Sequence, residues 1–287
     1  IAITGTNGKT TTTVLTAHLL DEAGHRAAPG GNVGGGLAPT ASDLALMEPP
    51  PEWYVLELSS FQLGAIDTLQ PDIGVLLNLS PDHLDYSGGS VESYYADKAR
   101  LFDNADDESR WVLPLDDAAV EALAGNAPGR RFHFSGQEAD GAHAFLRDGV
   151  LTLRMDGGEE GVLPIGDLPL LGRHNHLNAL AAALTARLAG AGRDALERGL
   201  RTARPLPHRM APVVESAGVL WVNDSKATNV AATRSALVSL ARPIVLLVGG
   251  KDKGEDFSAL RPALDRVRVV LAYGAAGARL ADELEGG

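Results

Sequence analysis

The chain alternates short apolar runs with segments of helical periodicity. A buried-strand pattern at residues 1–4 is followed by apolar residues that recur at helical spacing between 10 and 23. Gly24 stands where a glycine commonly ends a helix. Two later runs, 53–58 and 73–79, are apolar throughout, as is typical of parallel strands covered on both faces. These patterns predict an α/β fold with a mostly parallel sheet.

The middle of the chain continues this pattern and then changes character. A helical pattern at 91–102 precedes an apolar strand pattern at 111–113. Residues 131–163 alternate between apolar and polar side chains and contain Gly-rich turns, which predicts a small antiparallel elaboration. A long Ala-rich helix is then expected to begin near Asn175 and to end at Gly190 or Gly192.

Two closely spaced prolines divide the pattern into two parts. Because Pro205 and Pro207 interrupt regular structure twice in three residues, we expect an interdomain hinge there. Beyond them, three strand patterns alternate with helical ones, at 219–222, 244–248 and 267–273. The sequence therefore predicts a central domain over 1–205 and a C-terminal domain with a second, doubly wound sheet over 206–287.

The predicted pattern starts and stops abruptly. The chain begins directly on a strand, without an initiator Met, and ends in Glu285-Gly286-Gly287 after three strands of the second sheet. We therefore expect the fold to be truncated at both ends, with an incomplete C-terminal domain.

Composition and charge argue against several classes of protein. The sequence has 25 Lys and Arg residues against 37 Asp and Glu residues, a formal net charge of −12, which repels phosphate backbones and anionic lipid. No apolar run approaches the ~20 residues that span a bilayer. With no cysteine, the chain lacks disulfides, thiolate metal sites and cysteine nucleophiles. We expect a cytoplasmic protein that neither binds nucleic acid nor inserts into membranes.

A glycine-rich segment, residues 5–11, follows the first strand and is called the phosphate loop below. Its backbone N–H groups and the following helix start would face an anion, Lys9 adds a positive charge, and the Thr10 hydroxyl suits Mg²⁺. The common pattern has a glycine five positions before Gly8, where this chain has Ile3, so the loop is a shortened variant. The strand before it and the helix after it favour nucleotide binding over a plain Gly-rich turn.

Polar residues also follow the next two predicted strands. Glu57 closes an apolar strand, where a buried carboxylate needs a cation or strong donors. Mg²⁺ shared with Thr10 would be such a cation, and the alternatives are a helix-capping Glu or a solvated strand end. Asp82, His83 and Asp85 follow the third strand, at the sheet edge where open α/β sheets bind ligands. We therefore expect His83 to contact a metal or substrate.

One lysine lies on the apolar face of the predicted helix 91–102. Spacings of three and four place Lys98 beside Tyr94, Tyr95, Leu101 and Phe102. Burial lowers the pKa of an amine, and a neutral amine reacts with CO₂ to give a carbamate, an anion that can approach Mg²⁺ or phosphate. The alternative is a side chain whose ammonium reaches water.

Further polar groups collect at element ends in the second half of the chain. His174, Asn175 and Asn178 open the long helix, where they either read a base edge or cap the helix. Cations and donors recur at Arg209, at 223–229 and at 249–254. In an acidic protein, basic residues at strand ends indicate an anionic ligand, although solvated loops are the alternative.

Taken in order, these motifs resemble those of the ATP-dependent Mur ligases of peptidoglycan synthesis. The similar segments are residues 4–10, which contain most of the phosphate loop, the helix motif at 174–178 and the signature at 224–229. Residues 57–63 and 30–32 resemble, more narrowly, the members that add D-glutamate. The resemblance covers nearly the whole chain and implies a P-loop ATPase-like central domain followed by a Rossmann-like domain. The family's UDP-binding N-terminal domain is expected to lie outside this chain.

The resemblance also implies a role for individual residues. The ATP phosphates would contact Gly5, Thr6, Asn7, Gly8, Lys9, Thr10, Thr11 and Thr12. Other parts of the nucleotide would contact Asn178, Arg209 and Asp224. Mg²⁺ would be held by Thr10, Glu57, His83 and a carbamylated Lys98. UDP-N-acetylmuramoyl-L-alanine would meet Asn32, Ser59 and His83, and D-glutamate would meet Thr228 and Lys253. The expected catalytic residues are Lys9, Lys98, His83 and Lys226.

The implied reaction joins two small molecules. ATP would convert the alanine carboxylate to an acyl phosphate, which the amine of D-glutamate then attacks. The alternatives are a ligase of the family that adds another amino acid, a folylpolyglutamate-type ligase, or a P-loop kinase or NTPase. A monomer is expected in each case.

Overall fold

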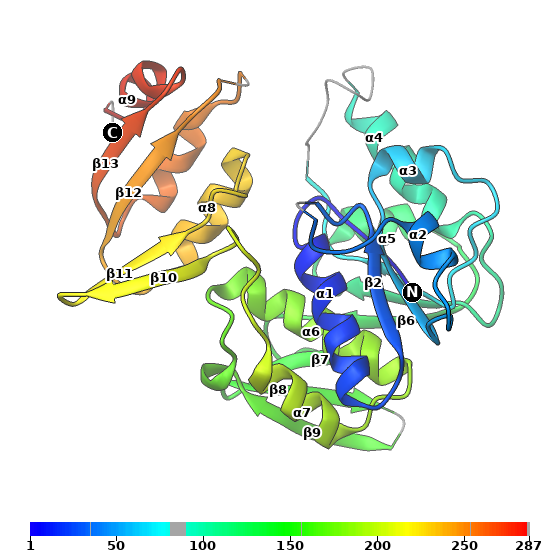
Figure 1. The fold of residues 1–287 in the computed structure, drawn as a ribbon. Helices are drawn as coiled ribbons and strands as arrows, with labels where there is room; N and C mark the ends of the chain where they lie inside the picture. Colours follow the sequence, from blue (N-terminus) through cyan, green and yellow to red (C-terminus); the bar gives the residue numbers. More distant parts are fainter. Residues whose placement is uncertain (35, 81–89, 156, 253, 286–287) are drawn as a thin grey trace. The chain divides into compact units, whose positions relative to one another are not determined.

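The computed structural model describes residues 1–34, 36–80, 90–155, 157–252 and 254–285. The chain divides into two compact units with a boundary between Arg204 and Pro205. The first unit comprises Ile1–Pro169 and Asn175–Arg204, and the second comprises Leu170–His174 and Pro205–Gly287. Figure 1 shows the helices and strands of both units.

A nine-stranded, mostly parallel sheet forms the centre of the first unit. Its strand order is β2-β3-β1-β4-β5-β6-β7-β8-β9. The bounds are β1 (Ala2–Thr4), β2 (Ala27–Gly31), β3 (Trp53–Glu57), β4 (Ile73–Leu76), β5 (Arg110–Pro114), β6 (Arg130–Phe134), β7 (Ala142–Arg147), β8 (Val150–Met155) and β9 (Gly158–Pro164). Neighbouring strands are parallel from β2 to β7, and β7, β8 and β9 are antiparallel. The prediction of a mostly parallel sheet is confirmed.

The alternating stretch after residue 130 belongs to this same sheet. The sequence predicted a small antiparallel elaboration at 131–163, and its last three strands are indeed antiparallel. However, β6 pairs parallel with β5, with Val112 opposite Phe132, and β7 continues parallel to β6. The antiparallel prediction is therefore confirmed for β7 to β9 and wrong for β6, whose parallel pairing makes the segment an extension of the main sheet.

The helices of the first unit follow the predicted order with additional short elements. Their bounds are α1 (Lys9–Glu22), α2 (Ala41–Ala45), α3 (Ser60–Gly64), α4 (Val91–Ala99), α5 (Ala118–Ala124), α6 (Arg173–Leu188) and α7 (Arg193–Thr202), with 3₁₀ turns η1 (Arg100–Phe102) and η2 (Ile165–Asp167). Figure 1 shows α1 alongside β2, and the two elements are in contact. Gly24 has a φ of 89° and follows the end of α1, as the glycine pattern predicted. None of the helices in the described residues combines the length and the apolar character that a bilayer span requires.

The packing of β4 against β5 explains why the predicted strands are apolar throughout. Trp111 on β5 is fully buried, and its ring contacts Phe102 edge-on with 4.7 Å between the ring centres. A Cβ atom on Gly74 would lie 2.3 Å from that ring. Only glycine at this position lets the indole cover the neighbouring strand. The indole N–H donates to the Pro128 carbonyl at 2.7 Å, so the buried polar group is satisfied.

The second unit contains two separate two-stranded sheets. The hairpin β10 (Ala211–Ser216) and β11 (Val219–Asn223) is antiparallel, whereas β12 (Ile244–Gly249) and β13 (Val267–Tyr273) are parallel. The helices are α8 (Val230–Ser239), η3 (Phe257–Ala263) and α9 (Gly277–Glu285). Leu237, Leu260 and Ala263 form a core against the parallel pair.

One strand that was predicted for the second sheet belongs instead to a hairpin. The sequence predicted that 219–222 joins 244–248 and 267–273 in one sheet, but β11 pairs with β10. The reason is the turn between them, where Ala217 and Gly218 both have positive φ, at 50° and 78°. Two positive φ values make the tight hairpin turn that returns the chain beside β10.

Candidate active site

The phosphate loop joins β1 to α1 and depends on two glycines. Gly5 and Gly8 have φ values of 145° and 87°. A Cβ atom on Gly8 would lie 2.2 Å from Asn178 Oδ1, and one on Gly5 would lie 3.1 Å from Leu77 Cβ. Because Gly8 is the N-cap of α1 and carries no side chain, the first-turn N–H groups of this helix are not capped by it. This is the geometry of an anion site at a helix start.

The ammonium group of Lys9 is hydrogen-bonded to the backbone of the phosphate loop. Lys9 Nζ donates to the carbonyls of Gly5 and Thr6, at 3.0 and 2.8 Å. The three residues that follow, Thr10, Thr11 and Thr12, are buried in the first turn of α1. The ammonium group therefore lies at the loop, where an incoming anion would compete with these two carbonyls for it.

Glu57 lies at the end of the strand next to β1. It is 3% exposed, and its register partner on β1 is Ile3. The Asn32 N–H donates to the Glu57 carbonyl at 2.9 Å, and Gly31, with a φ of 88°, lets the two backbones approach. The structure thus places Asn32 and the Glu57 carboxylate at the same sheet edge as the phosphate loop.

Ser59 acts locally as a helix cap. Its hydroxyl accepts a hydrogen bond from the Gln62 N–H at 3.2 Å, and its own N–H donates to Gln62 Oε1 at 3.0 Å. This reciprocal pair is a capping box at the start of α3. The sequence analysis assigned Ser59 to substrate and missed this role, although the Ser-x-x-Gln spacing is its sequence signature.

Lys98 is buried against the phosphate loop. It is 1% exposed, and its Nζ donates to the Gly5 carbonyl at 2.9 Å and to Thr4 Oγ1 at 3.4 Å. The Tyr94 ring centre lies 4.7 Å from the same nitrogen. The alternative in which this ammonium reaches water is therefore wrong. The Lys98 side chain, which comes from α4, instead contacts the phosphate loop at Gly5 and the end of β1 at Thr4.

The start of α6 packs on the same loop. Asn178 is 5% exposed, its Oδ1 lies next to Gly8, and its Nδ2 donates to Asn175 Oδ1 at 3.2 Å. The first unit therefore brings together, around one loop, a helix start, two lysines and a buried asparagine.

In the second unit, the predicted residues lie at the ends of β10 and β11. Asp224 Oδ1 accepts from the Met210 N–H at 2.9 Å, and the Lys226 N–H donates to the His208 carbonyl at 3.0 Å. Burial raises the pKa of the Asp224 carboxyl, while the Met210 N–H and the Arg209 guanidinium act in the opposite direction. The hairpin thus gathers Arg209, Asp224 and Lys226.

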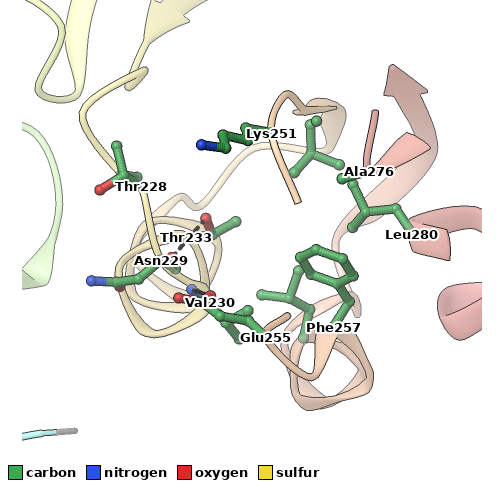
Figure 2. A pocket seen from close by; sticks show the side chains of 13 residues that line it. Thr228, Asn229, Val230, Thr233, Lys251, Glu255, Phe257, Ala276 and Leu280 are labelled. Carbon is green, nitrogen blue, oxygen red and sulfur yellow. Dashed lines mark hydrogen bonds between the residues drawn. The ribbon is translucent and has the colours of Figure 1, made fainter. Parts of the chain in front are cut away.

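A pocket lies between α8 and the end of β12 (Figure 2). Thr228 lines it, together with Lys251, which sequence reasoning placed in the basic segment 249–254 without giving it a role of its own. Three further polar residues line it, Asn229, Thr233 and Glu255, together with apolar side chains that include Val230, Val248, Phe257, Leu260, Ala276 and Leu280. The start of α8 is capped by protein, because Asn229 Oδ1 accepts from the Ala232 N–H at 2.7 Å and Glu255 Oε2 from the Val230 N–H at 2.6 Å.

Two predicted residues, His83 and Lys253, lie outside the described residues. Within the residues that are described, no three side chains of the types His, Cys, Asp and Glu gather as a metal site.

Two family models match the chain in the order of its two units. Residues 3–186 match the Mur ligase middle domain, and residues 208–287 match the Mur ligase glutamate ligase domain. The chain therefore belongs to the Mur ligase family.

Known proteins resemble the chain across its length. It is 40% identical over 291 residues to the UDP-N-acetylmuramoylalanine--D-glutamate ligase of Acidobacterium capsulatum, an alignment that covers 100% of this chain and 62% of that relative. A solved UDP-N-acetylmuramoyl-L-alanyl-D-glutamate--2,6-diaminopimelate ligase has a TM-score of 0.69 at 25% identity, covering 100% of this chain and 65% of the other. MurF from Thermotoga maritima in complex with ADP shares the fold, with a TM-score of 0.71 at 18% identity, covering 94% and 70%.

Proposed function

We propose that this chain provides the ATP-binding and amino-acid-binding parts of a ligase that joins D-glutamate to UDP-N-acetylmuramoyl-L-alanine. The phosphate loop, with a glycine N-cap that provides no side-chain cap and with Lys9, is the observation that carries the ATP-dependent part of the proposal. The D-glutamate ligase named above supports the choice of substrates.

The proposed reaction has two steps. First, the terminal alanine carboxylate attacks the γ-phosphorus of ATP, which gives an acyl phosphate and ADP. Second, the amine of D-glutamate attacks the acyl carbon through a tetrahedral intermediate, the amide bond forms, and inorganic phosphate leaves. The first step is needed because a carboxylate is a poor electrophile.

The chain's own residues would counter the repulsion between the reacting anions. Two unit charges of the same sign at 4 Å repel by about 4 kcal/mol at an effective dielectric constant of 20. Lys9 would exchange its bonds to the Gly5 and Thr6 carbonyls for phosphate oxygens, and the first-turn N–H groups of α1 would donate to the same phosphates.

The residues near the loop suit a magnesium ion. The Thr10 hydroxyl and the Glu57 carboxylate are oxygen donors, both are buried, and both follow adjacent strands of the sheet. Mg²⁺ prefers such ligands together with substrate phosphates. When bound, the ion would add positive charge where carboxylate and phosphate meet.

A second ion would need His83 and a modified Lys98. In the modification, a deprotonated Lys98 amine bonds to the carbon of CO₂ and loses a proton, which leaves a carbamate anion. Its burial beside Gly5 supports this proposal because the position is shielded from water. An intact-protein mass increased by one CO₂ would test it.

The second unit would hold D-glutamate and part of the nucleotide. Thr228 and Lys253 are the proposed D-glutamate contacts, and Arg209 and Asp224 the proposed nucleotide contacts, with Lys226 acting in catalysis. We likewise propose that 1–205 and 206–287 are the functional domains, that 205–207 is a hinge, and that the protein is a cytoplasmic monomer.

A panel of amino acids tests the proposal. ADP release is measured with UDP-N-acetylmuramoyl-L-alanine and each amino acid in turn, in the protein that carries this chain. We expect release that depends on D-glutamate. Strict dependence on another amino acid would contradict the substrate, and release without any amine would favour a kinase or NTPase.

A further inference from the structure

Asn78 lies two residues beyond the end of β4. Its side chain is hydrogen-bonded to both the backbone N–H and the backbone carbonyl of Asn7 in the phosphate loop. Its side-chain Oδ1 accepts from the Asn7 N–H at 2.9 Å, and its Nδ2 donates to the Asn7 carbonyl at 3.0 Å. Its main-chain carbonyl also accepts from the Thr6 N–H at 3.0 Å. A single residue from a neighbouring strand end therefore makes three hydrogen bonds to the loop.

These bonds determine which way two successive peptide groups face. In a trans peptide the N–H and the C=O point in opposite directions. Because the Asn7 carbonyl points to Asn78, the Gly8 N–H in the same peptide group points away from Asn78. Because the Asn7 N–H points to Asn78, the Thr6 carbonyl points away from it, where it accepts from Lys9 Nζ at 2.8 Å. Asn78 thus orients the groups on the opposite side of the loop.

Glycine alone does not fix this orientation. Gly8 has a φ of 87°, a conformation that glycine reaches without steric cost but to which it is not restricted. The neighbouring contacts act on a different residue: Thr6 Oγ1 donates to the Ser80 carbonyl at 2.9 Å and accepts from the Ser80 N–H at 3.0 Å. The Asn78 side chain therefore sets the orientation of the two peptide groups that Asn7 shares with Thr6 and Gly8.

We propose that Asn78 is a positioning residue for nucleotide phosphates. By holding Asn7 from one side, it presents the Gly8 N–H and the first-turn N–H groups of α1 toward the anion on the other side. The inference rests on the proposed function, because it takes the ligand to be ATP. It adds that the loop is preorganised from the end of β4 and not only by its own glycines.

Three variants test this role. Asn78→Ala removes the two side-chain bonds, and Asn78→Asp keeps the acceptor for the Asn7 N–H but places a carboxylate against the Asn7 carbonyl. Asn104→Ala is the matched control, because Asn104 Nδ2 donates to the Asp67 and Leu69 carbonyls, at 2.9 and 3.1 Å, elsewhere in the same unit. All three are compared at a temperature where circular dichroism shows them folded.

The first measurement is the affinity for ATP with Mg²⁺, by calorimetry. We expect Asn78→Ala to weaken binding by about tenfold, the equivalent of one net hydrogen bond of about 1.4 kcal/mol. Asn78→Asp should weaken it further, because the carboxylate repels the Asn7 carbonyl that the amide group held in place. Asn104→Ala should bind within about twofold of the natural chain. A loss in Asn78→Ala no greater than in Asn104→Ala would overturn the inference.

The second measurement needs no ligand. Amide hydrogen exchange followed by NMR should show faster exchange of the Asn7 N–H in Asn78→Ala than in the natural chain, and no change in Asn104→Ala. Unchanged exchange at Asn7 would overturn the inference even if ATP binding fell. If the natural chain bound no ATP, the proposed function would fail, and exchange at Asn7 would alone decide whether Asn78 fixes the loop.

Discussion

The starts of α1 and α8 follow the same local plan, a strand, a loop and a helix, yet they differ in what meets the first-turn N–H groups. At α1 the N-cap is Gly8, which has no side chain. At α8 the Asn229 and Glu255 side chains accept hydrogen bonds from the helix start. The start of α1 thus has no side-chain cap, whereas two protein side chains occupy the start of α8. We propose that side-chain capping, more than loop composition, distinguishes the candidate phosphate site at α1 from the start of α8.

The strongest test of this comparison is to remove the cation at α1. Lys9→Ala should weaken ATP binding by about 100-fold and abolish turnover, because two charge-assisted bonds of about 1.5 kcal/mol each are lost. Thermal unfolding should change little, since the two loop carbonyls to which the ammonium group donates can meet water once the side chain is removed. Arg26→Ala, which removes an exposed cation paired with Glu52, is the control. Near-normal ATP turnover in Lys9→Ala would contradict the phosphate-loop assignment.

The second test adds one carbon atom to the loop. Gly8→Ala should destabilise the first unit by about 2 kcal/mol, because the residue has positive φ and the new Cβ meets Asn178 Oδ1. Urea denaturation measures the loss. The double variant Gly8→Ala with Asn178→Ala should recover part of it, since the clash is then removed and the backbone strain remains. Equal stability of Gly8→Ala and the natural chain would show that the loop adopts another conformation.

A third test removes the cap at α8. Asn229→Ala should lower the free energy of unfolding by about 1 kcal/mol, the usual effect of losing an N-cap, and leave ATP phosphate binding unchanged. Asn229→Asp keeps an acceptor and is the matched control. Denaturation and calorimetry on the same samples give both values. A drop in phosphate affinity in Asn229→Ala would place the anion at α8 and reverse the comparison.

The smallest effect concerns pH and the second unit. Burial raises the pKa of Asp224 above the unfolded value of 3.8, so the protonated form is favoured on folding. Its contribution to stability is present below the unfolded pKa and is lost as pH rises through the folded pKa. Asp224→Asn, whose Oδ1 can still accept from Met210, should therefore gain in relative stability from acidic to neutral pH. A difference that does not vary with pH would contradict this.

In the first unit, the apolar runs that sequence reasoning assigned to strands have buried centres, whereas β12 and β13, which it also found, carry exposed residues. The runs around Ile3, Val55 and Val75 are apolar because neighbours cover them on each side. By contrast, β2 escaped prediction, since Ala27–Gly31 contains small residues and a proline and lies at the sheet edge, where proline is tolerated. The helix α7 was also missed, although Arg193 and Arg201 both pair with Glu197 at helical spacing.

The candidate site was predictable where chemistry follows from local sequence. The loop around Lys9 could be found because its glycines, lysine and threonines are contiguous. The spacing placed Lys98 on an apolar face but could not decide between burial and solvent, because that depends on Gly5 and Thr4 lying opposite. The contact of Asn78 with Asn7 could not be anticipated, since it arises from the lateral pairing of β1 with β4.

The close fit of Gly74 and Trp111 has an evolutionary consequence. Any side chain at position 74 would enter the space of the indole, so neither position can change freely while the other is kept. We expect homologous chains to exchange the two together, a larger residue at 74 accompanying a smaller ring or an aliphatic residue at 111. Such paired substitutions would show, from sequences alone, that β4 and β5 are neighbouring strands.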